Sequence, residues 1–265
     1  MSIATKIRNQ LRKARWIIKN YRNIQPGSEL MPNIFQGPVV FKADGVMTSN
    51  NCDFMKEQRF VRAYQAAEAT NPWEGFNLPW RMYVVCSLAE MVKSLPGDFV
   101  ECGVNTGAYA RGVIEYVNFS SLGKTFYLLD TYQGLVREQI TDAEYRAGVG
   151  EYLTTYKDVY KQVVDTFKPF PVKIIKGAVP GTLVQCDAER ICYLSIDMNV
   201  VEPEIAAANF FWDKIVPGGV MVLDDYGFPA HIAQKKAFDQ FAVEKNATLL
   251  YIPTGQAIIF KPVSS

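Results

Sequence analysis

Histidine is nearly absent from this chain of 265 residues, since His231 is the only one. A single histidine excludes a His-rich zinc site and argues against a catalytic triad built around a histidine base. Acid and base chemistry in this protein must therefore come from carboxylates.

Disulfide frameworks and membrane spans are also missing from the sequence. The five cysteines are an odd number and contain no CxxC pair, which is typical of reduced, mostly buried thiols in a cytoplasmic protein. No apolar run reaches the roughly 18 residues of a membrane-spanning helix, and the N-terminus lacks the apolar core of a signal peptide. We therefore expect a cytoplasmic protein that is neither exported nor integral to a membrane.

The chain as a whole has almost no net charge, but its N-terminal segment is strongly basic. The 28 Lys and Arg residues nearly balance the 27 Asp and Glu residues, so nothing favours a nucleic-acid partner. Residues 1–28, by contrast, carry seven basic side chains and no acid. Their apolar residues recur at steps of three and four, which predicts a helix with a cationic face. Such a helix either packs on the domain or on another subunit of a homo-oligomer, or lies peripherally on an anionic membrane surface.

The order of the predicted elements indicates an α/β fold. Helices expected at 53–70 and 79–94 precede an alternation of helices with strands that are apolar on both faces, the pattern of a parallel sheet covered by helices. We expect strands at 99–102, 125–130, 172–176, 191–196 and 220–224, and helices at 109–117, 151–167, 203–215 and 231–244. The last two strands, at 248–253 and 256–261, are too close for a helical crossover and must form an antiparallel hairpin. This mostly parallel, seven-stranded sheet is similar to the Rossmann-like fold of class I methyltransferases.

The chain is expected to have two parts. Residues 1–75 form an N-terminal helical extension or lid, made of the basic helix, an irregular segment over 23–52 that is rich in Pro and Gly, and one further helix. Residues 76–265 form the α/β domain.

A glycine-rich turn joins the first strand of that domain to its helix, in the sequence DFVECGVNTG over 98–107. Its spacing is ExGxxxG and not the GxGxxG of dinucleotide sites, because residue 105 is Asn. ExGxxxG is the spacing of S-adenosylmethionine sites, where glycines let the backbone approach the ligand and amides at the helix start favour its polar parts. The residues expected to hold the cofactor here are Glu101, Gly103, Val104, Asn105, Thr106 and Gly107. A purely structural turn is the alternative.

Asp130 ends the next strand and is followed by Thr131, and we expect both residues to contact the cofactor. A carboxylate at this position can accept hydrogen bonds from both ribose hydroxyls of an adenosine cofactor. The adenine would then lie near the end of the following strand, where Gly177 and Ala178 leave room for a flat ring. Alternatively, the Asp130 carboxylate caps Thr131 or the turn after it.

Three acids follow the next two strands: Asp197 after YLSI, and Asp224 and Asp225 after VMVL. Adjacent parallel strands deliver their carboxyl-end residues to one crevice, so we expect these acids to converge. Two carboxylates about 4 Å apart repel by about 4 kcal/mol at an effective dielectric constant of 20, so a protein either protonates one or binds a metal. Oxygen ligands without His or Cys favour Mg²⁺, Mn²⁺ or Ca²⁺ over zinc. Caps and turn formers are the alternative roles.

Together these segments resemble a known family. The stretches Gly97–Gly107, Asp130–Leu135, Tyr193–Glu204 and Val216–Tyr226 are similar to the macrocin O-methyltransferase (TylF-type) family, and the resemblance covers roughly residues 95–262. Members use S-adenosylmethionine and a divalent metal such as Mg²⁺ to methylate a sugar hydroxyl, usually on a glycosylated natural product.

The resemblance implies roles for the three acids. Asp197, Asp224 and Asp225 match the metal ligands of the family, and Asp197 also matches the candidate base beside the acceptor hydroxyl. One position departs from the pattern: the family usually reads D-x-D, and here the second acid is replaced by Asn199. An amide oxygen can still ligate a cation but brings no charge.

Several functions remain open at this point. A NAD-dependent sugar-nucleotide enzyme is disfavoured by the missing GxGxxG and by the terminal hairpin. A catalytically silent cofactor-binding domain acting in a complex is favoured by Asn199 and the basic helix, and a catechol-like diol could replace the sugar or glycan acceptor. His231 either touches the substrate or begins a helix with a solvated ring. We expect an S-adenosylmethionine-dependent, metal-assisted O-methyltransferase that methylates a hydroxyl of a sugar or of a glycosylated natural product or polysaccharide.

Overall fold

A computed structural model describes residues 37–263 of the chain. The chain divides into two compact units, residues 1–56 and 57–265. The predicted basic helix, like residues 1–36 as a whole, lies outside the described residues.

The described part of the first unit contains an antiparallel hairpin of β1 (Phe41–Ala43) and β2 (Val46–Thr48), followed by the 3-10 turn η2 (Asp53–Lys56). The prediction of an irregular segment over 23–52 is wrong for this hairpin. Asp44 and Gly45 join its strands, and both have positive φ, 51° and 72°. An Asp-Gly pair is the usual sequence signal for such a two-residue turn, so the hairpin could have been found.

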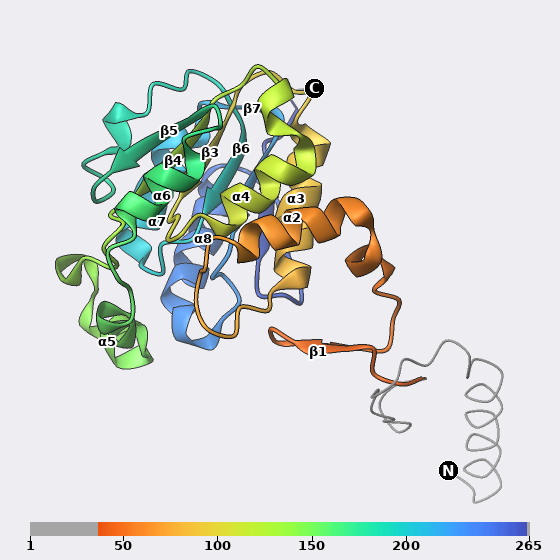
Figure 1. Cartoon of the computed structure of the whole chain (residues 1–265). Coiled ribbons are helices and arrows are strands. Elements are labelled where there is room, and N and C mark those ends of the chain that lie inside the picture. Colours follow the sequence, from red (N-terminus) through yellow and green to blue (C-terminus); the bar gives the residue numbers. More distant parts are fainter. Residues whose placement is uncertain (1–36, 264–265) are drawn as a thin grey trace, which may run out of the picture. The chain divides into compact units, whose positions relative to one another are not determined.

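The second unit is built around a seven-stranded sheet, which confirms the predicted fold class (Figure 1). The strands are β3 (Asp98–Cys102), β4 (Phe126–Asp130), β5 (Val172–Lys176), β6 (Ile191–Ile196), β7 (Ile215–Leu223), β8 (Leu249–Tyr251) and β9 (Ala257–Phe260). Their order is β5-β4-β3-β6-β7-β9-β8. The first five strands run parallel, whereas β9 is antiparallel to both β7 and β8.

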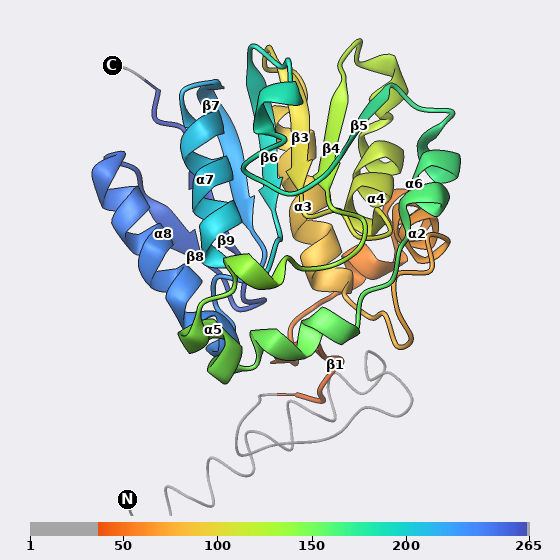
Figure 2. The same cartoon turned by 90° about the vertical axis from the view of Figure 1, so that its left-hand side faces the viewer.

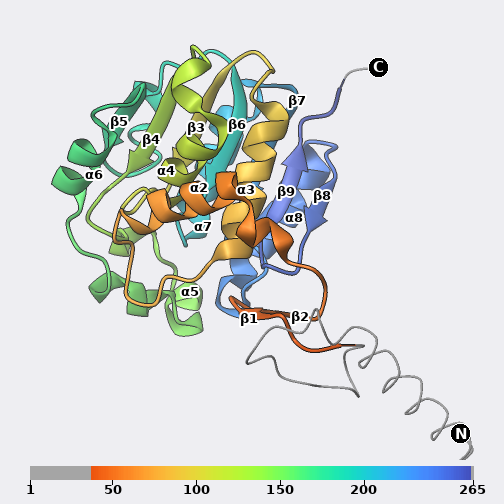
Figure 3. The same cartoon turned by 45° about the vertical axis from the view of Figure 1, so that its right-hand side comes forward.

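Helices cover both faces of this sheet. The α-helices of the second unit are α2 (Gln58–Glu68), α3 (Pro79–Val92), α4 (Ala108–Val117), α5 (Asp142–Ala147), α6 (Tyr160–Phe167), α7 (Val201–Trp212) and α8 (Ile232–Glu244). Figures 2 and 3 show α7 and α8 on one face and α3 and α4 on the other. Phe211 and Phe238 of α7 and α8 are fully buried in the core that they form with β9 and the five parallel strands. No helix in the described part of the chain is long and apolar enough to cross a membrane.

Helix α2 belongs to the second unit, whereas the sequence assigned it to the extension that ends at residue 75. It packs along α4, where the guanidinium of Arg59 lies 4.0 Å from the ring centre of Tyr116. Four of the five thiols are buried, as predicted, and that of Cys52 is partly exposed.

Two predicted elements differ from the observed ones because of contacts distant in sequence. The helix expected over 151–167 is interrupted: the 3-10 turn η5 (Val149–Thr154) ends early, and the amide of Val159 donates to the carbonyl of Tyr132 at 3.0 Å instead of to a helical carbonyl. Strand β7 begins five residues before the predicted 220, at Ile215. The amide of Gly218 donates to the carbonyl of Lys261, which extends the pairing beyond β9.

Candidate functional site

A pocket of about 1110 Å³ opens at the carboxyl ends of the parallel strands. Its walls are the turn after β3, the end of β4, the ends of β6 and β7, and the tyrosines Tyr152 and Tyr156. Figure 2 shows α5 and the segment that follows it at this end of the sheet. The pocket therefore lies where an open α/β sheet normally binds its ligands.

The two glycines of the turn after β3 are required by close packing. Gly103 has a φ of +87°, and a Cβ placed there would lie 1.8 Å from the carbonyl oxygen of Asp197. Gly107 has a φ of +88° and precedes α4, and a Cβ there would lie 2.3 Å from the ring of Phe167. The turn is thus pressed against the strand end that carries Asp197.

Asp130 holds this turn from the neighbouring strand. Its Oδ2 accepts hydrogen bonds from the amides of Val104 at 2.6 Å and Asn105 at 2.8 Å. Its Oδ1 accepts from the amide of Tyr132 at 2.6 Å. The hydroxyl of Thr131 lies 3.2 Å from the same Oδ1 and 2.6 Å from the carbonyl oxygen of Gly134. Two amides expected to face the cofactor are therefore donors to Asp130, which makes the capping contacts that the sequence left open.

The remaining predicted cofactor residues lie around the same pocket. Glu101 is buried, and burial together with the charges of Asp197 and Asp130 raises the pKa of its carboxyl well above the ordinary value. The hydroxyl of Thr106 lies 3.0 Å from that of Thr70. Gly177 and Ala178 line the pocket beside β4, where the amide of Gly177 donates to the carbonyl of Asp130 at 2.9 Å.

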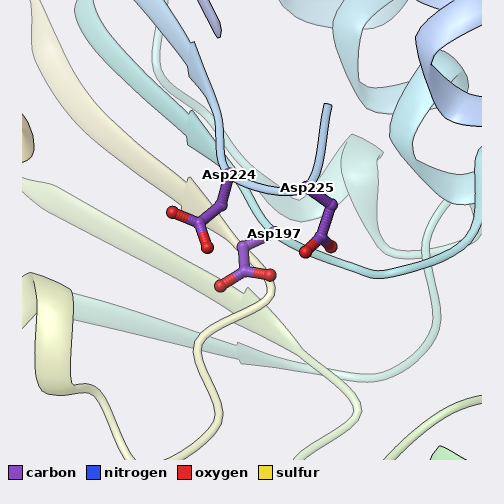
Figure 4. A group of neighbouring side chains, drawn as sticks. All are labelled: Asp197, Asp224 and Asp225. Atoms are coloured by element: carbon purple, nitrogen blue, oxygen red, sulfur yellow. The ribbon is translucent and has the colours of Figure 1, made fainter. Parts of the chain in front are cut away.

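The three acids of β6 and β7 lie together (Figure 4). One carboxylate oxygen from each of Asp197, Asp224 and Asp225 lies within 4.8 Å of the other two. Asp197 is half-buried and the other two are buried. Strands β6 and β7 are neighbours in register, Ile196 opposite Leu223, so the residue after each strand reaches the same point.

Asp224 accepts hydrogen bonds from three side chains, none of which the sequence singled out. Nη1 of Arg81 lies 2.6 Å from its Oδ2. Its Oδ1 accepts from the hydroxyl of Tyr109 at 3.0 Å and from Nε2 of Gln256 at 2.9 Å. These residues come from α3, α4 and the turn before β9, and no local pattern marks them.

The other two acids are electrostatically strained. Burial and the charges of Asp224 and Asp225 raise the pKa of Asp197 well above its ordinary value. Burial and the charges of Glu204 and Asp224 raise the pKa of Asp225 in the same way. Within the described residues, Oδ2 of Asp225 is buried and has no hydrogen-bond partner.

This donor set fits a divalent cation of the Mg²⁺ type. It offers carboxylate oxygens without nitrogen or sulfur, the ligand chemistry that Mg²⁺ prefers. The unpartnered oxygen of Asp225 is costly in a buried position unless a cation or proton satisfies it.

His231 is buried at the end of the 3-10 turn η7 (Pro229–His231), directly before α8. Its ring stacks parallel to that of Tyr152, with centroids 6.2 Å apart, and burial lowers the pKa of the imidazole. The prediction of a solvated ring is wrong, because Tyr152 folds over it. His231 and Asn199 both line the pocket.

Comparison with known proteins identifies the family to which this chain belongs. The profile of the macrocin O-methyltransferase (TylF) family matches residues 80–251, from α3 to the end of β8. The chain belongs to the TylF family.

A curated relative of this TylF-family chain is the mycinamicin III 3''-O-methyltransferase of Micromonospora griseorubida. The two are 23% identical over 159 residues, which is 55% of this chain and 61% of the relative. The chain therefore spans less than two thirds of the length of that enzyme.

Solved methyltransferases share the fold. The O-methyltransferase NovP superposes with a TM-score of 0.60 and 20% identity, over 69% of this chain and 80% of NovP. The calicheamicin methyltransferase CalS11 superposes with a TM-score of 0.52 and 14% identity, over 80% of this chain and 98% of CalS11. At these identities the likeness shows a class I methyltransferase fold.

Proposed function

We propose that this TylF-family chain is an S-adenosylmethionine-dependent O-methyltransferase that methylates a hydroxyl of a sugar, in a glycosylated natural product or polysaccharide, with the help of a divalent cation. The supporting observation is that the turn after β3, Asp130 and the three clustered acids all line one pocket. The names of the mycinamicin and calicheamicin methyltransferases favour a glycosylated acceptor.

The cofactor would lie across the ends of β3, β4 and β5. Asp130 would accept from the ribose hydroxyls while it holds the turn, and Gly177 and Ala178 would border the adenine. The turn from Gly103 to Gly107, with Glu101 beneath it, would carry the remainder of the cofactor. The carboxyl of Glu101 has a raised pKa, which favours its neutral form and lets it donate a hydrogen bond.

The reaction would be an in-line displacement at the methyl carbon. The acceptor oxygen forms a bond to that carbon, the carbon–sulfur bond breaks, and the sulfonium becomes a neutral thioether. Positioning of the two reactants can supply about 7 to 11 kcal/mol of the barrier. The hydroxyl proton would pass to Asp197, the half-buried acid of the cluster.

Asp197, Asp224 and Asp225 would hold the cation. A bound divalent cation lowers the pKa of a hydroxyl and orients it. Positive charge also counteracts the repulsion that raises the pKa of Asp197, and so favours the ionised form that can take a proton.

Transfer of a labelled methyl group from S-adenosylmethionine to glycoside acceptors tests this proposal. Asp225→Asn should lose activity that raised Mg²⁺ partly restores, whereas Asp197→Asn should not be rescued if that residue also takes the proton. Turnover that is untouched by a chelator would refute the role of the cation, and calorimetry that shows no binding of S-adenosylmethionine would refute the methyltransferase function.

Residues 1–28 would act outside catalysis. Their seven basic side chains without an acid suit an anionic membrane surface, at about 1 kcal/mol per cationic side chain, or a second subunit. The cytoplasmic location and a homo-oligomeric state stay predictions.

A further inference from the structure

One cation already lies against the acid cluster. Arg81 of α3 reaches Asp224 with Nη1 2.6 Å from Oδ2, and the two side chains are 13% and 4% exposed. Its guanidinium also lies 5.3 Å from the ring centre of Phe228. Among the ion pairs found in the described part of the chain, this is the one that reaches Asp197, Asp224 or Asp225.

Asp224 is the acid of the cluster that has this counter-ion, and its other carboxylate oxygen also accepts hydrogen bonds. Tyr109 and Gln256 donate to its Oδ1 while Arg81 occupies its Oδ2. Oδ2 of Asp225, by contrast, has no hydrogen-bond partner among the described residues. Asp224 is therefore the acid from which a divalent cation would have to displace a guanidinium.

We propose that Arg81 is a displaceable counter-ion, which competes with the divalent cation for Asp224 and leaves this carboxylate when the cation binds. The inference rests on the proposed cation site. A guanidinium at Oδ2 and a doubly charged ion on the same carboxylate repel each other across a buried space, where screening by water is weak.

Competition has a measurable consequence. The intrinsic affinity of the three carboxylates for the cation is reduced by the free energy needed to break the pair between Arg81 and Asp224. Removal of the Arg81 guanidinium should therefore tighten binding of the divalent cation, whereas removal of a basic side chain elsewhere in the protein should not.

Binding of Mn²⁺, followed by electron paramagnetic resonance of the free ion, tests the proposal in the full chain. Arg81→Gln should bind Mn²⁺ at least about tenfold more tightly than the wild type, and Arg81→Lys, which keeps the charge, should have an affinity between the two. Arg59→Gln is the matched control, because Arg59 pairs with Glu90 away from the pocket, and its affinity should equal that of the wild type.

Equal or weaker binding by Arg81→Gln would overturn the proposal, while leaving the cation site itself intact. Failure of the wild type and every variant to bind Mn²⁺ would instead contradict the cation in the proposed function, and the inference with it.

A second measurement does not depend on the stability of a variant. In the wild type, the guanidinium resonance of Arg81 should shift and its protons should exchange faster with solvent as diamagnetic Mg²⁺ is added. An unchanged resonance at saturating Mg²⁺ would show that Arg81 stays on Asp224, and would refute displacement.

Discussion

Replacement of Asp130 by alanine removes the carboxylate that holds the turn after β3. The amides of Val104 and Asn105 then lose the Oδ2 acceptor at 2.6 and 2.8 Å. The amide of Tyr132 loses Oδ1 on the other side. The change therefore tests two functions of one side chain: the support of the turn and the proposed contact with the ribose.

The expected loss of stability follows from these contacts. A hydrogen bond to a charged group contributes about 1.5 to 3 kcal/mol. The two amides of the turn alone account for about 3 to 6 kcal/mol, and water that enters the half-buried site offsets part of the total loss. We expect Asp130→Ala to lower the free energy of unfolding by about 3 kcal/mol. Asp130→Asn keeps one oxygen acceptor and should lose about half as much.

Calorimetry with two ligands separates the ribose contact from the support of the turn. The wild type should bind S-adenosylhomocysteine roughly ten- to a hundredfold more tightly than its 2′-deoxy analogue. Asp130→Ala should bind both weakly and equally, because the group that distinguishes them is gone. A variant that still prefers the hydroxylated ligand as strongly as the wild type would refute the ribose contact. Unchanged unfolding by urea would refute the support of the turn.

Three further changes test other parts of the account. Gly103→Ala should lower the free energy of unfolding in urea by more than about 4 kcal/mol, because the new Cβ would lie 1.8 Å from a backbone oxygen. The control Gly123→Ala has nothing within 4 Å of the new Cβ and should cost about 1 to 2 kcal/mol, so equal losses would refute the packing argument. Burial raises the pKa of Glu204 to about 8, so the folded chain holds a proton that the unfolded chain releases near pH 4.5. The free energy of unfolding of the wild type should therefore fall as the pH rises from about 5 to 8, and that of Glu204→Gln should fall less. Parallel pH profiles of the two proteins would contradict this. A chain that begins near residue 50 should bind S-adenosylhomocysteine like the full chain but sediment less with anionic vesicles, and equal sedimentation would exclude a membrane role for residues 1–28.

Features that depend on neighbouring strands could be predicted from the sequence. Strands β5 and β6 have the predicted bounds. Strand β6 is buried at every position, as its almost uninterrupted apolar run predicts for a parallel strand inside a sheet. The meeting of Asp197 with Asp224 follows from the same logic, since both come directly after adjacent strands. A local signal also marks the start of α5, because Thr141 and Glu144 form a capping box there, although no helix is predicted at this position.

Features that depend on the docking of distant elements could not be predicted. Arg81 reaches Asp224 from a helix 143 residues earlier in the chain, and Gln256 reaches it from the turn of the terminal hairpin. Neither position shows a local pattern, because the tertiary packing of α3 and β9 against β7 decides the contact. The burial of His231 under Tyr152 has the same origin, since η5 is remote in sequence from the start of α8.

The central claim is that one pocket places the methyl group of S-adenosylmethionine beside a cation held by the three acids. Paramagnetic relaxation tests it most directly: the nuclear relaxation of a ¹³C-labelled cofactor methyl group is followed while Mn²⁺ is added to the full chain. We expect strong enhancement that requires the protein, is reversed by excess Mg²⁺ and is greatly reduced in Asp225→Asn. Relaxation that Mn²⁺ leaves unchanged, with the cofactor demonstrably bound, would contradict the account.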